Sequence, residues 1–95
     1  MSQIHKVNMP KWGMEMSEGV IAEWHLAVGD TVNAEDDLVD VETSKIVNTV
    51  TAPASGVLRR ILAQSGGTYP VGAALCIIAD AGTSEADIDQ YVSAL

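Results

Sequence analysis

The sequence places a single lysine, Lys45, in a long acidic stretch. Between Lys11 and Arg59 it is the only lysine or arginine, whereas Asp and Glu recur throughout the same span. Strand-like runs at residues 38–43 and 46–50 flank it, so only two residues separate them. Two residues are the length of the tightest hairpin connection. We therefore predict that Lys45 stands on a hairpin turn with its amine in water.

An amine in this setting suits attachment better than nucleophilic catalysis. A Schiff-base or nucleophilic lysine needs desolvation or a neighbouring cation to lower the pKa of its amine. Asp40 and Glu42 are close in sequence instead, and they favour the charged form. Another enzyme would then have to activate the group that Lys45 receives. From spacing alone, an ordinary solvated turn lysine remains an alternative.

The other polar residues form no catalytic or metal-binding motif. His5 and His25 are not spaced as a ligand pair, and the sequence holds no Cys/His cluster. It has neither a phosphate-binding glycine loop nor a Gly-x-Ser-x-Gly elbow. Cys76, in an apolar run, is expected to be a buried hydrophobe. We therefore expect no catalytic residue and no metal in this chain.

The charge and hydropathy of the chain exclude two classes of partner. The formal net charge is -8 over 95 residues, which repels phosphate backbones and anionic lipid surfaces, so we expect neither nucleic acid nor membrane as a partner. The start of the chain lacks the apolar core of a signal peptide, and the longest apolar run, residues 73–79, is too short to cross a bilayer. We expect a cytoplasmic bacterial protein rather than one of the mitochondrial matrix.

The elements that would position Lys45 come from an internal repeat. At an offset of 37 residues, five positions are identical and others keep apolar character. The aligned pairs are Gly19/Gly56, Val20/Val57, Ile21/Leu58, Trp24/Ile61, Gly29/Gly66, Thr31/Thr68, Leu38/Leu75 and Val41/Ile78. Two halves that each have one apolar face can cover one another. The same offset maps Lys45 onto Gly82, so these two positions are expected at opposite poles.

Short runs rich in β-branched residues and separated by turn residues predict eight strands. They cover residues 4–9, 20–25, 31–32, 38–43, 46–50, 57–63, 68–69 and 74–79. Glycines at 29, 66 and 67 would supply positive φ angles in the turns. We predict an all-β fold, a flattened barrel or sandwich of two four-stranded sheets with internal pseudo-two-fold symmetry.

Two segments depart from the repeat. Residues 11–17 are an insertion in the first half and read as a surface loop, in which Trp12 is expected to pack against the domain. In the tail, Ile88, Tyr91, Val92 and Leu95 follow one helical face, and Ser84 with Asp87 makes a weak capping box. We place the domain at residues 1–81. Residues 82–95 are then a linker or a short helix that leads to a further domain.

Three stretches carry a resemblance to a known family. They are "MPKWGMEMSEGVIAEWH", "GDTVNAEDDLVDVETSKI" and "APASGVL". They resemble the lipoyl domains of the acyltransferase components of 2-oxo acid dehydrogenase complexes, in particular those of the acetoin and pyruvate branches. The likeness covers about residues 3–80. Ser44 departs from the family, in which most members have aspartate before the lysine.

The resemblance implies a carrier function and a set of partners. Lys45 would carry lipoate as an amide, in the turn formed by Glu42, Thr43, Ser44 and Ile46. The loop residues Trp12, Gly13, Met14, Glu15 and Met16 would help the acylating enzyme to recognise the domain. Expected partners are a thiamin-diphosphate enzyme, dihydrolipoamide dehydrogenase, a lipoate ligase or lipoyl transferase, and an acyltransferase domain with coenzyme A. The domain alone would be no enzyme, but a part of a dihydrolipoyllysine-residue acetyltransferase that carries an acyl group, taken to be acetyl.

Two alternatives remain open on the sequence. A biotin carrier domain shares the fold, but it normally has methionine on both sides of the modified lysine, where this chain has Ser44 and Ile46. An unmodified β module that only binds proteins is the other alternative.

Overall fold

The computed structural model of the chain describes residues 4–14, 16–44 and 46–95, and it contains the eight predicted strands in order. Their bounds are β1 (Ile4–Asn8), β2 (Glu18–Trp24), β3 (Thr31–Val32), β4 (Asp37–Glu42), β5 (Val47–Thr51), β6 (Gly56–Ile61), β7 (Thr68–Pro70) and β8 (Ala74–Ala79), followed by the helix α1 (Glu85–Ser93). Each strand lies within two residues of its predicted bounds, because the runs rich in β-branched residues and the turn residues between them are read directly from the sequence.

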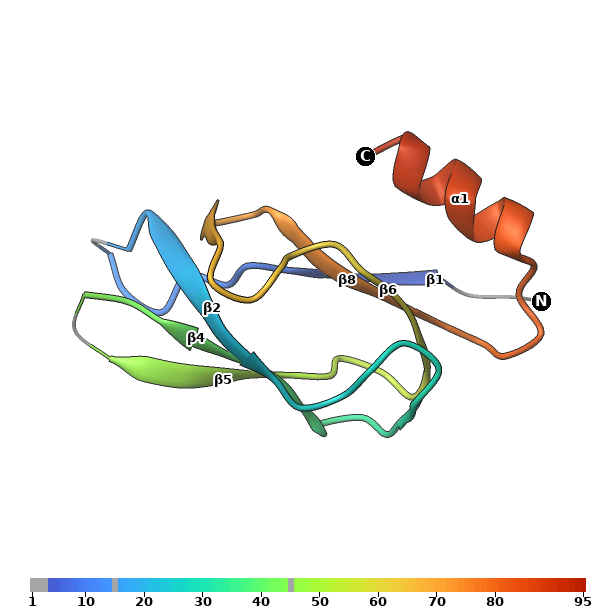
Figure 1. Cartoon of the computed structure of the whole chain (residues 1–95), viewed down its shortest axis with the longest axis horizontal. Coiled ribbons are helices and arrows are strands. Elements are labelled where there is room, and N and C mark those ends of the chain that lie inside the picture. Colours follow the sequence, from blue (N-terminus) through green and yellow to red (C-terminus); the bar gives the residue numbers. More distant parts are fainter. Residues whose placement is uncertain (1–3, 15, 45) are drawn as a thin grey trace.

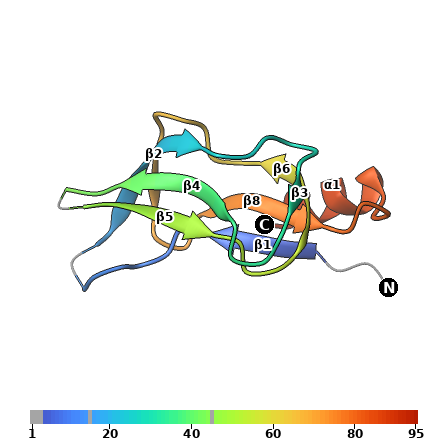
Figure 2. The same ribbon diagram turned by 90° about the horizontal axis from the view of Figure 1, so that it is seen from below.

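The strands form two four-stranded antiparallel sheets that face one another (Figures 1 and 2). The strand orders are β1-β8-β6-β3 and β5-β4-β2-β7. The repeat relates β1 to β5, β2 to β6, β3 to β7 and β4 to β8. Exchanging the members of each pair converts one strand order into the other. Each half of the repeat therefore contributes strands to both sheets. The predicted all-β fold with internal pseudo-two-fold symmetry is confirmed.

The pseudo-symmetry extends to the backbone of the turns. Gly29 and Gly66, related by the offset of 37, have φ angles of 101° and 85°, as predicted. Gly67 was also expected at positive φ, but it is not among the positive-φ residues. A second related pair, Glu35 and Gly72, has φ angles of 73° and 89°. The first half thus holds a glutamate in a conformation for which the second half uses glycine.

Side chains of β4 and β8, one central strand from each sheet, fill the space between the sheets. Leu38, Val39 and Val41 of β4 and Leu75, Cys76 and Ile78 of β8 are fully buried. The related glycines Gly19 and Gly56 admit this close packing. A Cβ atom at Gly19 would collide with the side chain of Val41, and one at Gly56 would lie 3.0 Å from the carbonyl oxygen of Ala79.

The tail forms the helix α1, which lies on the outer face of the first sheet (Figure 1). Ser84 caps the helix, because the backbone N–H of Asp87 donates to its Oγ at 3.1 Å. Ile88 is fully buried and packs on Ile77 and Ala79 of β8. Strand β8 is therefore covered on both faces, by the second sheet on one side and by α1 on the other.

Candidate functional site

The connection between β4 and β5 is closed as a tight turn. The backbone N–H of Thr43 donates to the carbonyl oxygen of Ile46 at 2.8 Å. The N–H of Ile46 and the hydroxyl of Thr43 lie 3.2 Å apart and are hydrogen bonded. Residues 43 and 46 therefore face one another, and two residues lie between them, as predicted for the hairpin. Lys45 itself lies outside the described residues.

This hairpin and the chain exit lie at opposite ends of the molecule. In both views, the connection between β4 and β5 is at one end of the long axis, and the turn that follows β8 is at the other (Figures 1 and 2). The molecule extends over 40 Å along this axis. The sequence repeat relates this hairpin to the turn after β8, in agreement with their positions at the two ends.

The inserted loop lies beside the hairpin and forms a groove with it. The groove has a volume of about 850 Å³. Its lining combines the loop, the start of β2 and the hairpin: Trp12, Gly13, Met14, Met16, Ser17, Glu18, Gly19, Val20, Glu42, Thr43, Ser44 and Ile46. The structure thus brings together the predicted turn residues and the predicted loop residues. Glu15, also predicted for this loop, lies outside the described residues.

The loop is anchored at its two ends and exposed at its tip. Trp12 and Met16 are half-buried and pack against the core, which confirms the expectation for Trp12. The N–H of Trp12 donates to the sulfur of Met16 at 3.3 Å, and the N–H of Met16 donates to the carbonyl oxygen of Gly13 at 3.1 Å. Between them, Met14 is 94% exposed. An exposed thioether on an anchored loop is a candidate contact for a partner protein.

Several apolar side chains around the groove are also open to solvent. Val20 on β2, Ile46 in the turn and Val47 on β5 are exposed, with the carboxylates of Glu18 and Glu42 beside them. Val20 pairs with Glu42, and Glu42 pairs with Val47, across neighbouring strands. We call Met14, Val20, Ile46 and Val47 the apolar patch. Val20 and Val47 were not predicted as site residues, although strand alternation places Val20 on the face opposite to the buried Gly19 and Ile21.

A cluster of three polar side chains lies on the sheet β5-β4-β2-β7, outside the lining of the groove. Nε2 of His25 lies 2.9 Å from Oδ1 of Asp40, and the hydroxyl of Thr49 donates to the same oxygen at 2.7 Å. The hydrogen bond to Asp40 raises the pKa of His25, and the hydrogen bonds from His25 and Thr49 lower the pKa of Asp40. His25 was expected within a strand, but β2 ends at Trp24.

Other chemistry finds no support in the described ranges. No group of three or more His, Cys, Asp or Glu side chains there is arranged to hold a metal ion. Cys76 is buried as predicted, and burial raises the pKa of its thiol to about 12. Across the described part of the chain, no helix is long and apolar enough to span a membrane.

Comparisons with known proteins identify the family of the chain. Residues 5–78 match the family described as "Biotin-requiring enzyme". The acetyltransferase component of the acetoin cleaving system of Pseudomonas putida is 48% identical over 97% of the chain, and that of Cupriavidus necator is 46% identical over 90%. The chain spans about a quarter of the length of these relatives, 25% and 23%.

A solved structure shows the same fold. The lipoyl domain of the 2-oxoglutarate dehydrogenase complex from Azotobacter vinelandii superposes with a TM-score of 0.64 and 32% identity, over 77% of this chain and 92% of that domain. Together with the tight hairpin between β4 and β5, these matches show that the chain belongs to the biotinyl and lipoyl carrier family, as a lipoyl domain similar to those of acetoin-system acetyltransferases.

Proposed function

We propose that this domain carries lipoate on Lys45, joined to the side-chain amine by an amide bond. The observation that carries the proposal is the hydrogen bond between Thr43 and Ile46, which closes a connection with only two residues between them. A residue in such a turn can be reached by a modifying enzyme without any opening of the core.

The residues around the turn suit the attached group. Lipoate supplies a dithiolane that accepts an acyl group, and this chemistry belongs to the cofactor rather than to the protein. The arm is a neutral aliphatic chain, and the groove beside the turn offers Trp12, Met14, Met16 and Ile46 as apolar neighbours. The chain's own part is to hold the attachment point at one end of a rigid body. It also supplies the surface that partners contact.

The carried group would be acetyl, and the domain would be part of a dihydrolipoyllysine-residue acetyltransferase in a bacterial cytoplasm. The names of the relatives in Pseudomonas putida and Cupriavidus necator support this assignment. A thiamin-diphosphate enzyme would load the arm, and an acyltransferase domain would pass the acetyl group to coenzyme A. Dihydrolipoamide dehydrogenase would then reoxidise the dithiol of the arm. A tether to the larger protein would hold the arm at roughly millimolar effective concentration near these sites.

The loading enzyme would recognise the apolar patch together with the loop residues Trp12, Gly13, Met14, Glu15 and Met16. An exposed apolar surface rimmed by charge is typical of protein interaction sites. Glu18 and Glu42 are exposed at its edge and would favour a basic partner surface. The patch is next to the turn, so an enzyme bound there has the arm within reach.

The test is intact mass after incubation with lipoate ligase, lipoate and ATP. The wild type and a Lys6→Arg control, altered at an exposed lysine of β1, should gain one lipoyl group. Lys45→Arg should gain none and keep the unfolding midpoint of the wild type, because a turn lysine contributes little to stability. Lipoylation of Lys45→Arg would refute the site. With biotin ligase and biotin in place of the lipoate reagents, biotinylation of the wild type would favour the biotin carrier.

A further inference from the structure

We propose that α1 is a reversible latch. It docks on the outer face of the first sheet, is held there by two arginines of β6, and opens as a unit while the two sheets stay folded. The segment that follows β8 would then have a short, docked form and a long, released form.

The apolar part of the docking surface is small. Ile88 is the one fully buried residue of α1, and it packs on Ile77 and Ala79. Tyr91 and Val92, on the same face of the helix, are only half-buried. Ile4 and Leu62 complete this cluster. One buried side chain and two partly covered ones therefore hold a helix of nine residues.

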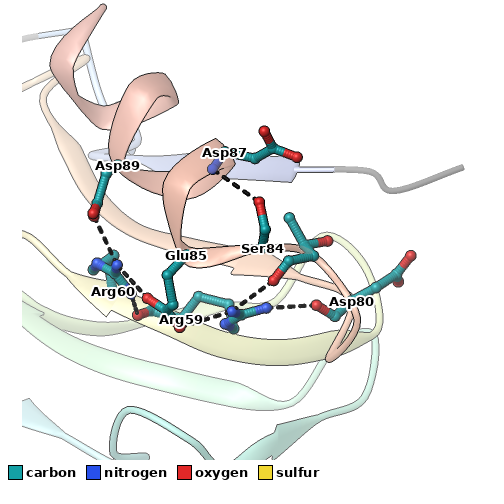
Figure 3. Close-up of polar contacts among 8 residues, drawn as sticks. Arg59, Arg60, Asp80, Ser84, Glu85, Asp87 and Asp89 are labelled. Atoms are coloured by element: carbon teal, nitrogen blue, oxygen red, sulfur yellow. Dashed lines mark hydrogen bonds and ion pairs between the residues drawn. The ribbon is translucent and has the colours of Figure 1, made fainter.

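Arg59 ties down the turn that leads into α1 (Figure 3). Its guanidinium donates to the carbonyl oxygen of Asp80 at 2.6 Å, to that of Thr83 at 2.8 Å and to the Glu85 carboxylate at 2.8 Å. Its side chain is only 10% exposed. Hydrogen bonds from a charged donor are stronger than those between neutral groups, so Arg59 is the firmest attachment of the latch.

Arg60 adds a second attachment that is open to solvent. Its guanidinium donates to Glu85 and, at 2.8 Å, to Oδ1 of Asp89 (Figure 3). The side chains of Glu85 and Asp89 are 65% and 69% exposed. Ion pairs with such exposure contribute little and are screened by salt. These two arginines are two of the five lysine and arginine residues of the chain, which has a net charge of -8.

Two features favour the release of α1. An isolated helix of this length is marginal in water, so α1 depends on its docking contacts. The hydroxyl of Thr83 is buried without a hydrogen-bond partner among the described residues, and a buried unpaired hydroxyl destabilises the state that contains it. Strand β8, in contrast, is paired on both edges, with β1 and β6. Elements with few buried contacts open first.

Release would change the reach of the chain. Nine residues span roughly 14 Å as a helix and up to about 30 Å when extended. This consequence rests on the proposed function, since it requires that the chain continues as a tether to an acyltransferase. The latch itself does not require lipoylation, so it can be tested on the unmodified 95 residues.

The test is native-state amide hydrogen exchange followed by NMR. At low salt, amides of residues 88–92 should be protected, but by a factor roughly tenfold or more below that of residues 75–78 in β8. High salt should lower protection in α1, because it screens the ion pairs that Arg59 and Arg60 make with Glu85 and Asp89. Equal protection of α1 and β8 would make the helix a fixed part of the domain. A complete lack of protection in α1 at low salt would mean that it does not dock. Either result overturns the latch.

Variants separate the ionic attachment from a general effect of charge. Arg60→Gln should reduce the protection of α1 several-fold and remove most of its salt dependence. Lys6→Gln removes one exposed positive charge from β1 of the same sheet and serves as the matched control. Asp89→Asn, altered on the helix side of the same ion pair, should reproduce part of the Arg60→Gln effect. If Lys6→Gln and Arg60→Gln act alike, the arginine does not hold the latch.

Discussion

Replacing Glu35 by glycine should stabilise the domain. Glu35 has a φ angle of 73°, whereas its related residue in the second half is Gly72 at 89°. A non-glycine residue in the left-handed conformation costs roughly 1–2 kcal/mol. Glycine removes this strain but adds about 0.5–1 kcal/mol of unfolded-chain entropy. The net gain in the free energy of unfolding is about 0.5–1 kcal/mol, or a Tm increase of roughly 2–8 °C for a domain of this size.

The assay is thermal or urea unfolding of Glu35→Gly beside two further variants. Gly72→Ala should lose about as much stability as Glu35→Gly gains, because it places a side chain at the related positive φ. Ala34→Gly, in the same turn but at a residue without positive φ, should lose about 0.5–1 kcal/mol. The backbone hydrogen bond from Glu35 to Ala52, at 2.8 Å, does not depend on the side chain. A Tm for Glu35→Gly at or below that of the wild type would refute the argument.

Two more predictions concern the helix and the patch. Hydrogen bonds from Arg59 and Arg60 lower the pKa of Glu85, so the docking of α1 is fully stabilised above the ordinary pKa of that carboxyl and weakens as the pH falls through the lowered value. Helical circular dichroism should therefore fall in acid before the sheet signals do. Unchanged helicity at acidic pH would contradict the prediction that docking depends on the ionised Glu85 carboxylate. Met14→Ala should slow reductive acetylation of the lipoylated domain by the proposed thiamin-diphosphate enzyme about 5–30-fold, the effect of removing a typical interface contact of roughly 1–2 kcal/mol. Val28→Ala, at an exposed residue outside the patch, should have no effect on that rate.

The strands and their arrangement were predictable because the repeat fixes them twice. The aliphatic runs around Leu38 and Leu75 give the buried strands, and the shared glycines at 29 and 66 give the turns. The same offset of 37 could also have revealed Glu35, since it maps onto Gly72. A glutamate by itself gives no local sign of a positive φ.

The helix was predictable in part. Its cap at Ser84 and the spacing of Ile88 and Tyr91 are local signals, and both are present in the sequence. Its docking is not local. Arg59 and Glu85 are 26 residues apart, and nothing in the residues around either one shows that they meet. Alternatives such as a free linker could be separated from a docked helix only by the three-dimensional structure.

The groove was also predictable only in part. Its two halves, the inserted loop and the lysine turn, were each identified from the sequence as separate features. Their contact depends on the length and register of β2 and β4. Val20 and Val47 enter the patch through cross-strand pairing with Glu42, which single-sequence patterns do not specify.

The pairing of the first strand with the last has a consequence for how such a domain can be mounted. Ile4 lies opposite Ala79 in the antiparallel pair of β1 and β8, so the polypeptide enters and leaves the folded body at one pole. A domain whose two chain ends lie side by side can be inserted at any point of a longer polypeptide, singly or in tandem. Its opposite end then stays clear of the flanking linkers.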